Sequence, residues 1–97
     1  MRYRLTAKAE EDIVRIFAEG ARLFGIGVAE NYHRELEAVL DLIAENPRLA
    51  RERLEITPPL RIHPHKTHLI LYLVSEANEI LIVRIRHSHE DWENSPL

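Results

Sequence analysis

The spacing of the apolar residues changes once along this chain, at Pro47. From Thr6 to that proline, apolar residues recur every three or four positions, which is the spacing of one face of an α-helix. After it, they alternate with polar residues or run together in short segments bounded by polar and proline-containing stretches, as β-strands do. Helices gathered first and strands gathered later predict an α+β fold, one sheet with the helices on one face.

Two amphipathic helices are expected before Pro47. Thr6 can cap the first helix, and Gly25 can end it because glycine accepts a left-handed backbone conformation without Cβ strain. The second helix is expected from about Val28 to Asn46, since proline prevents its continuation. So short a connection predicts an antiparallel helical hairpin.

Polar residues on these helices have simple interpretations. Glu10, Glu11 and Asp12 fall in the first turns of the first helix, where carboxylates offset the exposed N–H groups, and this position explains the cluster. Tyr32 lies on the apolar stripe of the second helix and is expected in the core.

Strands are expected at both ends of the chain. Tyr3 and Leu5 alternate with Arg2 and Arg4, which predicts a short first strand. Later strands are expected at 60–63 (ending near Pro64), at 67–74 (apolar on both faces and therefore central) and at 79–87. The expected order is β-α-α-β-β-β in an antiparallel-rich sheet, forming a single domain over residues 1–97.

Composition limits the class of protein. Of the 97 residues, 45% are hydrophobic and 30% charged, which is ordinary for a folded globular domain. The lack of cysteine excludes disulfides and thiolate metal sites. The N-terminus has no apolar segment typical of a signal peptide, and the longest apolar run, 69–74, is far shorter than the ~20 residues of a membrane helix. We therefore expect a cytoplasmic protein.

Charge is unevenly distributed. The net charge of −3 argues against a protein whose affinity depends on neutralising nucleic-acid phosphates. The ranges 56–75 and 80–89 nevertheless contain no acid, and their cationic residues include Arg61, Lys66, Arg84 and Arg86. A protein of low net charge can therefore still carry a locally positive face.

Strand alternation suggests where that face lies. If Leu81, Val83 and Ile85 pack under the helices, Arg84 and Arg86 emerge on the open face of the sheet. Such a face suits phosphate or a row of carboxylates. The alternative is that these arginines are solvated or pair with acids across strands.

Histidines occur as His63-x-His65 and His87-x-His89, with His68 nearby. Pairs two apart on a strand can ligate a metal, yet no carboxylate or cysteine completes a recognisable spacing. Hydrogen-bonding or surface histidines, with no metal or other cofactor, are expected. The chain also lacks a Gly-rich phosphate loop, a GxSxG motif and a cysteine nucleophile, which leaves covalent catalysis without a candidate.

Several segments, in order, resemble the RelE/ParE superfamily of toxins, specifically its ParE kind. They are RYRLTAKAEEDIVRI, LDLIAENPRLARER, THLILYLV and EILIVRIRHSHEDW. The resemblance implies a fold with the first strand beside the last. It also implies a toxin of a type II toxin–antitoxin system, inhibiting DNA gyrase by binding and neutralised by a ParD-like antitoxin in a hetero-oligomer. The antitoxin's disordered C-terminal segment is expected to fold onto the toxin.

RelE-like members of that superfamily instead cleave mRNA in the ribosome, using basic residues and often a tyrosine near the C-terminus. Here Ser88 follows His87, and no tyrosine follows Tyr72. The residues thus favour a non-enzymatic inhibitor, with the endoribonuclease and a non-toxic protein-interaction domain as alternatives. ParE sequences usually have Gly and Arg after the last strand, where this chain has Ser88 and His89, and this difference removes one fixed positive charge.

The resemblance and the charge pattern together give a set of candidate residues. Arg61, Arg84 and His87 are the catalytic candidates if the chain is a nuclease. An apolar groove beside the helical hairpin and the Arg84/Arg86 face are the places expected to receive the antitoxin, and no direct sequence-specific nucleic-acid contact is expected. The residues expected to contact the target or the antitoxin are Arg61, Lys66, Tyr72, Arg84, Arg86, His87 and Trp92.

Overall fold

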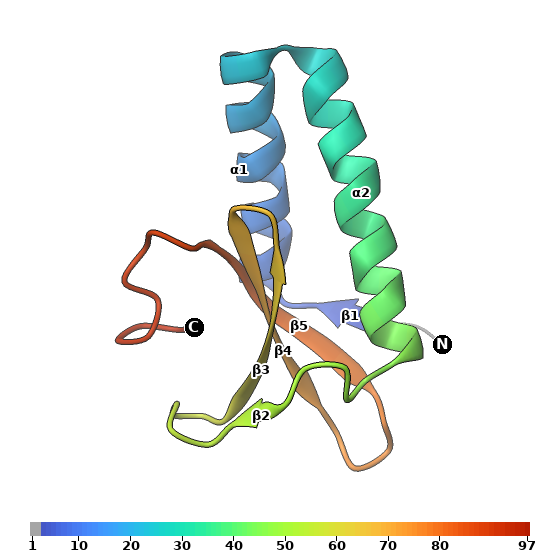
Figure 1. Cartoon of the computed structure of the whole chain (residues 1–97), viewed down its shortest axis with the longest axis vertical. Helices are drawn as coiled ribbons and strands as arrows, with labels where there is room; N and C mark the ends of the chain where they lie inside the picture. Colours follow the sequence, from blue (N-terminus) through green and yellow to red (C-terminus); the bar gives the residue numbers. More distant parts are fainter. Residues whose placement is uncertain (1–2) are drawn as a thin grey trace.

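The computed structural model describes residues 3–97, in which a helical hairpin packs on one face of a five-stranded sheet (Figure 1). The helices are α1 (Ala7–Phe24) and α2 (Ile26–Glu45), and the strands are β1 (Tyr3–Leu5), β2 (Glu52–Arg53), β3 (Leu60–His65), β4 (His68–Val74) and β5 (Ile80–His87). The sheet order is β1-β5-β4-β3-β2, with β1 parallel to β5 and the other neighbours antiparallel. The predicted α+β fold, with the first strand beside the last, is confirmed.

The helical hairpin begins and turns where local sequence signals place it. The Thr6 hydroxyl accepts a hydrogen bond from the Ala9 N–H at 3.0 Å, as an N-cap does. Gly25 ends α1 with φ at 94°, a region that side-chain-bearing residues rarely adopt. It is the whole connection, because α2 already begins at Ile26. Gly27, expected in the turn, therefore lies within α2.

The main core lies between the helices and the sheet. Leu36, Leu40 and Ile43 of α2 pack on Ile70 of β4, and all are essentially inaccessible to solvent. Tyr72 of β4 belongs to the same cluster, and its hydroxyl donates to the Pro47 carbonyl and accepts from the Ala50 N–H. The segment after α2 is thereby tied to the central strand, β4.

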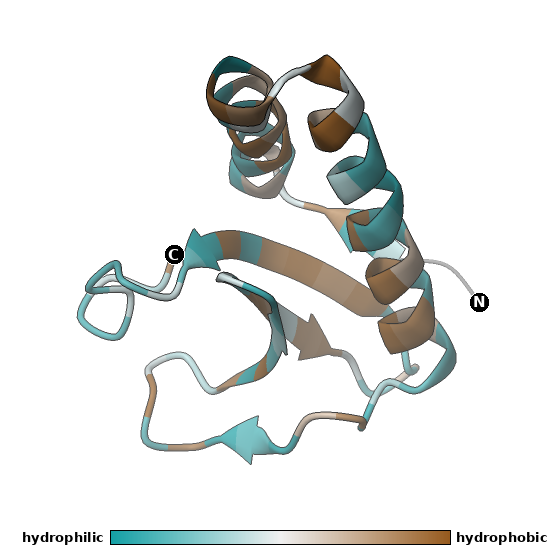
Figure 2. Ribbon diagram, turned by 45° about the horizontal axis from the view of Figure 1, so that its top comes forward, coloured by the Kyte–Doolittle hydropathy of each residue, from teal (hydrophilic) through white to brown (hydrophobic). Residues whose placement is uncertain are grey.

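A second, smaller apolar cluster covers the opposite face of the sheet. Ile56, Leu60, Leu71 and Val83 form it together with Trp92 from the C-terminal segment. Figure 2 shows the apolar colouring that runs along β5 between the two layers. The expectation that this face is open was therefore wrong, because the chain after β5 folds back and places an indole on it.

A β-bulge decides which residues of β5 face the helices. Leu71 pairs with Arg84 and Tyr72 with Ile82, so Val83 has no partner of its own on β4. The extra residue reverses the alternation, and Ile82 before it and Ile85 after it both pack under the helices. The predicted assignment of Leu81 and Val83 to the helical side was wrong for this reason.

Two further features of the strands differ from expectation. β3 continues through Pro64. The two-residue β2 pairs only with the start of β3, so at Pro64 β3 is the edge of the sheet, where a missing N–H is tolerated. β2 itself was not expected. Arg2, placed in the first strand by its alternation, lies outside the described residues. Within residues 3–97, neither helix is both long and apolar enough to span a membrane.

Candidate functional site

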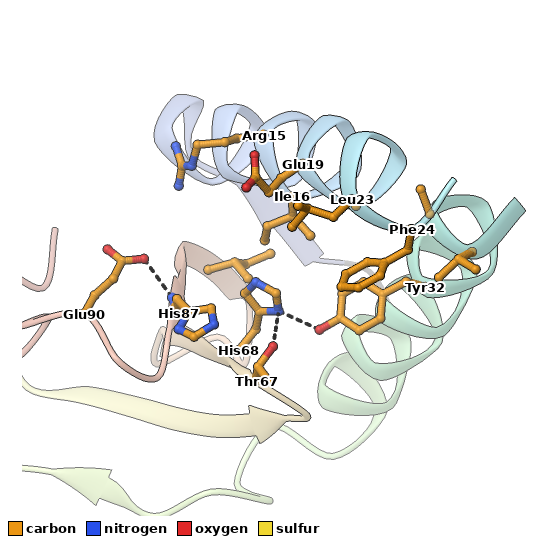
Figure 3. Close-up of a pocket in the computed structure, with 14 residues that line it drawn as sticks. Arg15, Ile16, Glu19, Leu23, Phe24, Tyr32, Thr67, His68, His87 and Glu90 are labelled. Atoms are coloured by element: carbon orange, nitrogen blue, oxygen red, sulfur yellow. Dashed lines mark hydrogen bonds between the residues drawn. The ribbon is translucent and has the colours of Figure 1, made fainter. Parts of the chain in front are cut away.

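A groove of about 610 Å³ opens between α1, the start of α2 and the ends of β4 and β5 (Figure 3). Its apolar lining includes Ile16, Leu23, Phe24, Val28 and Ile85, and its polar lining includes Arg15, Glu19, Tyr32, Thr67, His68, His87 and Glu90. An apolar cleft with a few convergent polar groups is the usual form of a binding site.

The apolar surface of the groove continues over the tip of the helical hairpin. Leu23 is 52% exposed, Phe24 68%, Ile26 59% and Val28 55%, and these residues flank the turn at Gly25. Figure 2 shows the same concentration of apolar residues at the tip. Large apolar side chains gathered at one place on a surface mark an interaction site, because each costs free energy in water.

A short hydrogen bond crosses the floor of the groove. The Tyr32 hydroxyl lies 2.6 Å from His68 Nδ1 (Figure 3). Burial, with a smaller contribution from Glu35, raises the pKa of Tyr32 to about 12, so the hydroxyl keeps its proton and donates. Burial lowers the pKa of His68, and His87 and His65 act in the same direction, so the imidazole accepts in its neutral form. Tyr32 was expected in the core but is half-buried and lines the groove.

Aromatic rings form a continuous row along this floor and beyond it at both ends. Centroid distances are 5.3 Å from His65 to Tyr32, 5.5 Å from Tyr32 to His68, 5.5 Å from His68 to His87 and 5.1 Å from His87 to His89. The row joins α2 to the ends of three strands. The His-x-His spacings revealed pairs but not this row. His68 and His87 pair directly, but counting outward from the β4–β5 turn would place Arg86 opposite His68, because the bulge adds one residue to β5.

The row does not form a recognisable metal site. In the part of the chain that the structure describes, no three or more His, Asp or Glu side chains gather closely enough to hold an ion.

Arg84 is bound by an acid from α1. Its Nε lies 2.7 Å from Asp12 Oδ2 and its Nη2 2.9 Å from Oδ1, while the Ile85 N–H donates to Oδ2 at 2.9 Å. Burial alone would raise the pKa of Asp12, but hydrogen bonds from Arg84, Ile85 and Arg15 outweigh it and hold the pKa below its usual range. The Arg84 side chain is 14% exposed, and its charge is neutralised.

Arg86 is bound by the C-terminal segment. Its Nε donates to Glu90 Oε2 at 3.0 Å and its Nη1 to the Ser95 carbonyl at 2.8 Å, leaving the side chain 12% exposed. The predicted positive sheet face around Arg84 and Arg86 was therefore wrong. Neither neighbouring strand supplies an acid, but α1 and the C-terminal segment each supply one.

Comparison with known proteins places this architecture in a family. The family model described as the ParE toxin of the type II toxin-antitoxin system, parDE, matches residues 3–92. The chain belongs to the ParE toxin family. It is 33% identical over 94 residues to Toxin ParE1 of Mycobacterium tuberculosis, covering 97% of this chain and 96% of the relative.

Two more distant likenesses agree. Toxin ParE1 of Caulobacter vibrioides is 29% identical over 85 residues, which is 88% of this chain and 86% of that protein. A solved structure titled "Chromosomal ParDE TA system from P. aeruginosa" superposes with a TM-score of 0.77 at 20% identity, covering 90% of this chain and 95% of that one. At that identity, the superposition supports the fold alone.

Four of the remaining candidate residues of this ParE-family chain are buried or are engaged in contacts within the protein. Tyr72 is buried and Trp92 is 8% exposed, so neither presents its ring to a partner in this structure. Arg61 donates to the Ala50 carbonyl at 2.6 Å. Lys66 pairs with Glu35 at 2.6 Å, and its Nζ lies 5.5 Å from the centroid of the Tyr32 ring.

Only His87 among the candidate residues lines the groove of this ParE-family chain. The apolar residues around Gly25 were not among the candidates, although a groove beside the hairpin was expected. Leu23 and Phe24 continue the three- and four-residue apolar spacing of α1, and that spacing alone does not separate buried from exposed residues. The apolar stripe of α1 is longer than the sheet can cover, and this excess length is the signal that could have found them.

Proposed function

We propose that this chain is the toxin of a type II toxin–antitoxin pair, that it inhibits DNA gyrase by binding, without turnover, in the cytoplasm, and that a ParD-like antitoxin neutralises it. The observation that carries the proposal is the exposed apolar groove on a ParE-family chain. The antitoxin's C-terminal segment is taken to fold as an amphipathic helix with its apolar face in this groove.

The arrangement of charges favours binding over catalysis. Cleavage of a phosphodiester needs an acid or base within reach of the reacting oxygens, with cations placed to receive the developing charge. Arg84 and Arg86 are instead engaged by Asp12 and Glu90. The groove has polar groups at its His87 end, but the large apolar side chains of Leu23, Phe24 and Val28 line its other end and suit a protein segment better than a phosphate backbone.

Antitoxin binding is tested by substituting a residue at the rim of the groove. Phe24→Ser should weaken binding of the ParD-like antitoxin by about tenfold or more, since burying a phenylalanine contributes about 1.5–3 kcal/mol. Val14→Ser is the matched control: Val14 is also on α1 and is 68% exposed, like Phe24, but does not line the groove. Equal affinities for the two variants, measured by calorimetry, would remove the groove from the proposal.

Gyrase inhibition is tested with a DNA supercoiling assay. The purified chain should inhibit the reaction, and stoichiometric antitoxin should restore it. Full supercoiling at saturating protein would contradict the gyrase target while leaving the toxin family untouched.

An endoribonuclease remains the second candidate, because His68, His87 and Tyr32 meet in one cleft and could exchange protons. Primer extension on translated mRNA would detect cuts, and His87→Ala should abolish them. Arg84→Ala is a poor probe, since it leaves the buried Asp12 without its main partner. Normal growth after induction without antitoxin would favour the third reading, a non-toxic interaction domain.

A further inference from the structure

His68 lies at the centre of the groove floor, and charged or titratable groups face it from every surrounding element. They are Arg15 and Glu19 on α1, Tyr32 on α2, His65 at the end of β3, and His87 and Glu90 at and beyond the end of β5. Three more groups lie one contact further from His68: Lys66 against Tyr32, Glu35 against Lys66 and His89 against His87. The rings of His68 and His87 meet edge to face at 81°.

The carboxylates near the groove are already engaged. Glu19 pairs with Arg22 at 2.7 Å, Glu35 pairs with Lys66 at 2.6 Å, and Glu90 pairs with Arg86 at 2.9 Å. Glu90 also accepts the backbone N–H of His87 at 2.8 Å. Glu90 favours a proton on His68, but its carboxylate is shared with Arg86, and burial, His65 and Arg15 all oppose that proton.

We propose that the groove is a proton-linked docking site, which holds an uncharged apolar face of its partner while His68 is neutral and releases it as His68 protonates. The inference rests on the proposed occupation of the groove by the antitoxin's apolar segment.

Water is the physical reason for the linkage. In the empty groove a protonated His68 is still partly hydrated, because its side chain faces an open cleft. An apolar occupant removes that water, and burying an unpaired charge costs several kcal/mol, so the occupied groove favours the neutral ring. By linkage, protonation of the ring must weaken binding of the occupant.

Hydrogen bonding adds to this cost. His68 Nδ1 accepts from the Tyr32 hydroxyl only while it is unprotonated. Once it is protonated, Tyr32 must turn its hydroxyl to accept from His68, and the phenolic hydrogen is left with the His65 carbonyl, which lies at the longer distance of 3.4 Å.

The test uses Nile red, an uncharged dye that fluoresces in apolar sites, with the full chain at pH 7.5 and 5.5. The dissociation constant is expected to rise about threefold at the lower pH, because an imidazole whose pKa is lowered is only partly protonated there. The double variant His68→Gln/His87→Gln should bind with the same affinity at both pH values. His33→Gln, a histidine on α2 that pairs with Glu37 and does not line this groove, should keep the wild-type dependence.

A second readout is the imidazole NMR titration of His68, whose pKa should fall further when the dye is bound. Circular dichroism at both pH values confirms that each variant is folded. Equal affinity at both pH values, tighter binding at pH 5.5, absence of dye binding, or a pH dependence retained by the double variant would each overturn the inference.

Competition by the antitoxin separates this inference from the proposed function. Dye that is bound in a pH-dependent way but not displaced by antitoxin would leave the proton linkage standing and remove the antitoxin from the groove. Dye that is displaced by antitoxin but bound equally at both pH values would keep the antitoxin in the groove and remove the proton linkage.

Discussion

Asp12 accepts a forked hydrogen bond from Arg84, at 2.7 Å from Nε and 2.9 Å from Nη2, joining residues 72 positions apart. The same carboxylate accepts the Ile85 N–H, at the edge of β5 that β1 leaves uncovered. Closer to β1, the Thr6 N–H donates to the Ile82 carbonyl and the Thr6 hydroxyl to that of Val83. Residues before and within α1 therefore continue the pairing of β1 along β5.

Removal of the Asp12 charge should destabilise the protein severely. Asp12→Asn retains the shape but leaves Arg84 unpaired at 14% exposure and places an amide N–H among donors. Breaking a buried ion pair from one side costs about 3–5 kcal/mol, and we expect about 3 kcal/mol in urea unfolding. Glu11→Gln, at an exposed acid next to Asp12 on α1, should cost less than about 0.5 kcal/mol. Similar losses for the two variants would contradict this role.

Acid should remove the same contribution. The folded-state pKa of Asp12 lies below its usual range, so the unfolded chain takes up a proton first as the pH falls. The stabilisation is complete above about pH 4, the ordinary aspartate pKa, and is lost as the pH falls through the lower folded-state pKa. Unfolding free energies of wild type and Asp12→Asn measured from pH 7 to 3 should therefore converge below about pH 4. A constant difference across that range would contradict the assignment.

The two glycines near the hairpin turn should respond in opposite directions. Gly25→Ala forces a Cβ onto a residue with φ at 94° and should cost about 1–3 kcal/mol, although nothing lies within 4 Å of the new atom. Gly27→Ala, within α2 and equally unobstructed, should be neutral or stabilise the helix by up to about 1 kcal/mol. Thermal unfolding of the two variants measures both effects, and destabilisation by both would contradict the backbone explanation.

Trp92 should act as a structural cover of the second sheet face. Trp92→Ala uncovers Leu71 and Val83 and is expected to cost about 3 kcal/mol, at the lower end of what large aromatic truncations cost. Far-UV circular dichroism in urea is the appropriate measurement, since Trp92 is the only tryptophan. Leu97→Ala, at a 44% exposed residue of the same segment, is the control and should change little. An unchanged midpoint for Trp92→Ala would show that the segment does not hold this face together.

Much of the fold follows from short stretches of sequence. Thr6 caps α1, Gly25 ends it and Pro47 follows α2, because capping, φ preference and the missing proline N–H act within a few residues. The central position of β4 was equally predictable, since only a strand covered on both faces is apolar on both. These signals act between residues close in sequence, and contacts with distant parts of the chain can override them only at a large cost in free energy.

The candidate site was harder to predict from sequence. Arg84 and Arg86 lacked nearby acids in the sequence, yet the tertiary structure brings Asp12 and Glu90 to them. The bulge at Val83 reversed which face of the sheet the side chains of half of β5 point to, and the alternation of apolar and polar residues cannot reveal an extra residue. The sequence by itself determined the helices, most of the strands and the family. Only the tertiary structure decided which charges are neutralised and that a row of histidines lies under an apolar groove, because both depend on contacts between elements far apart in the chain.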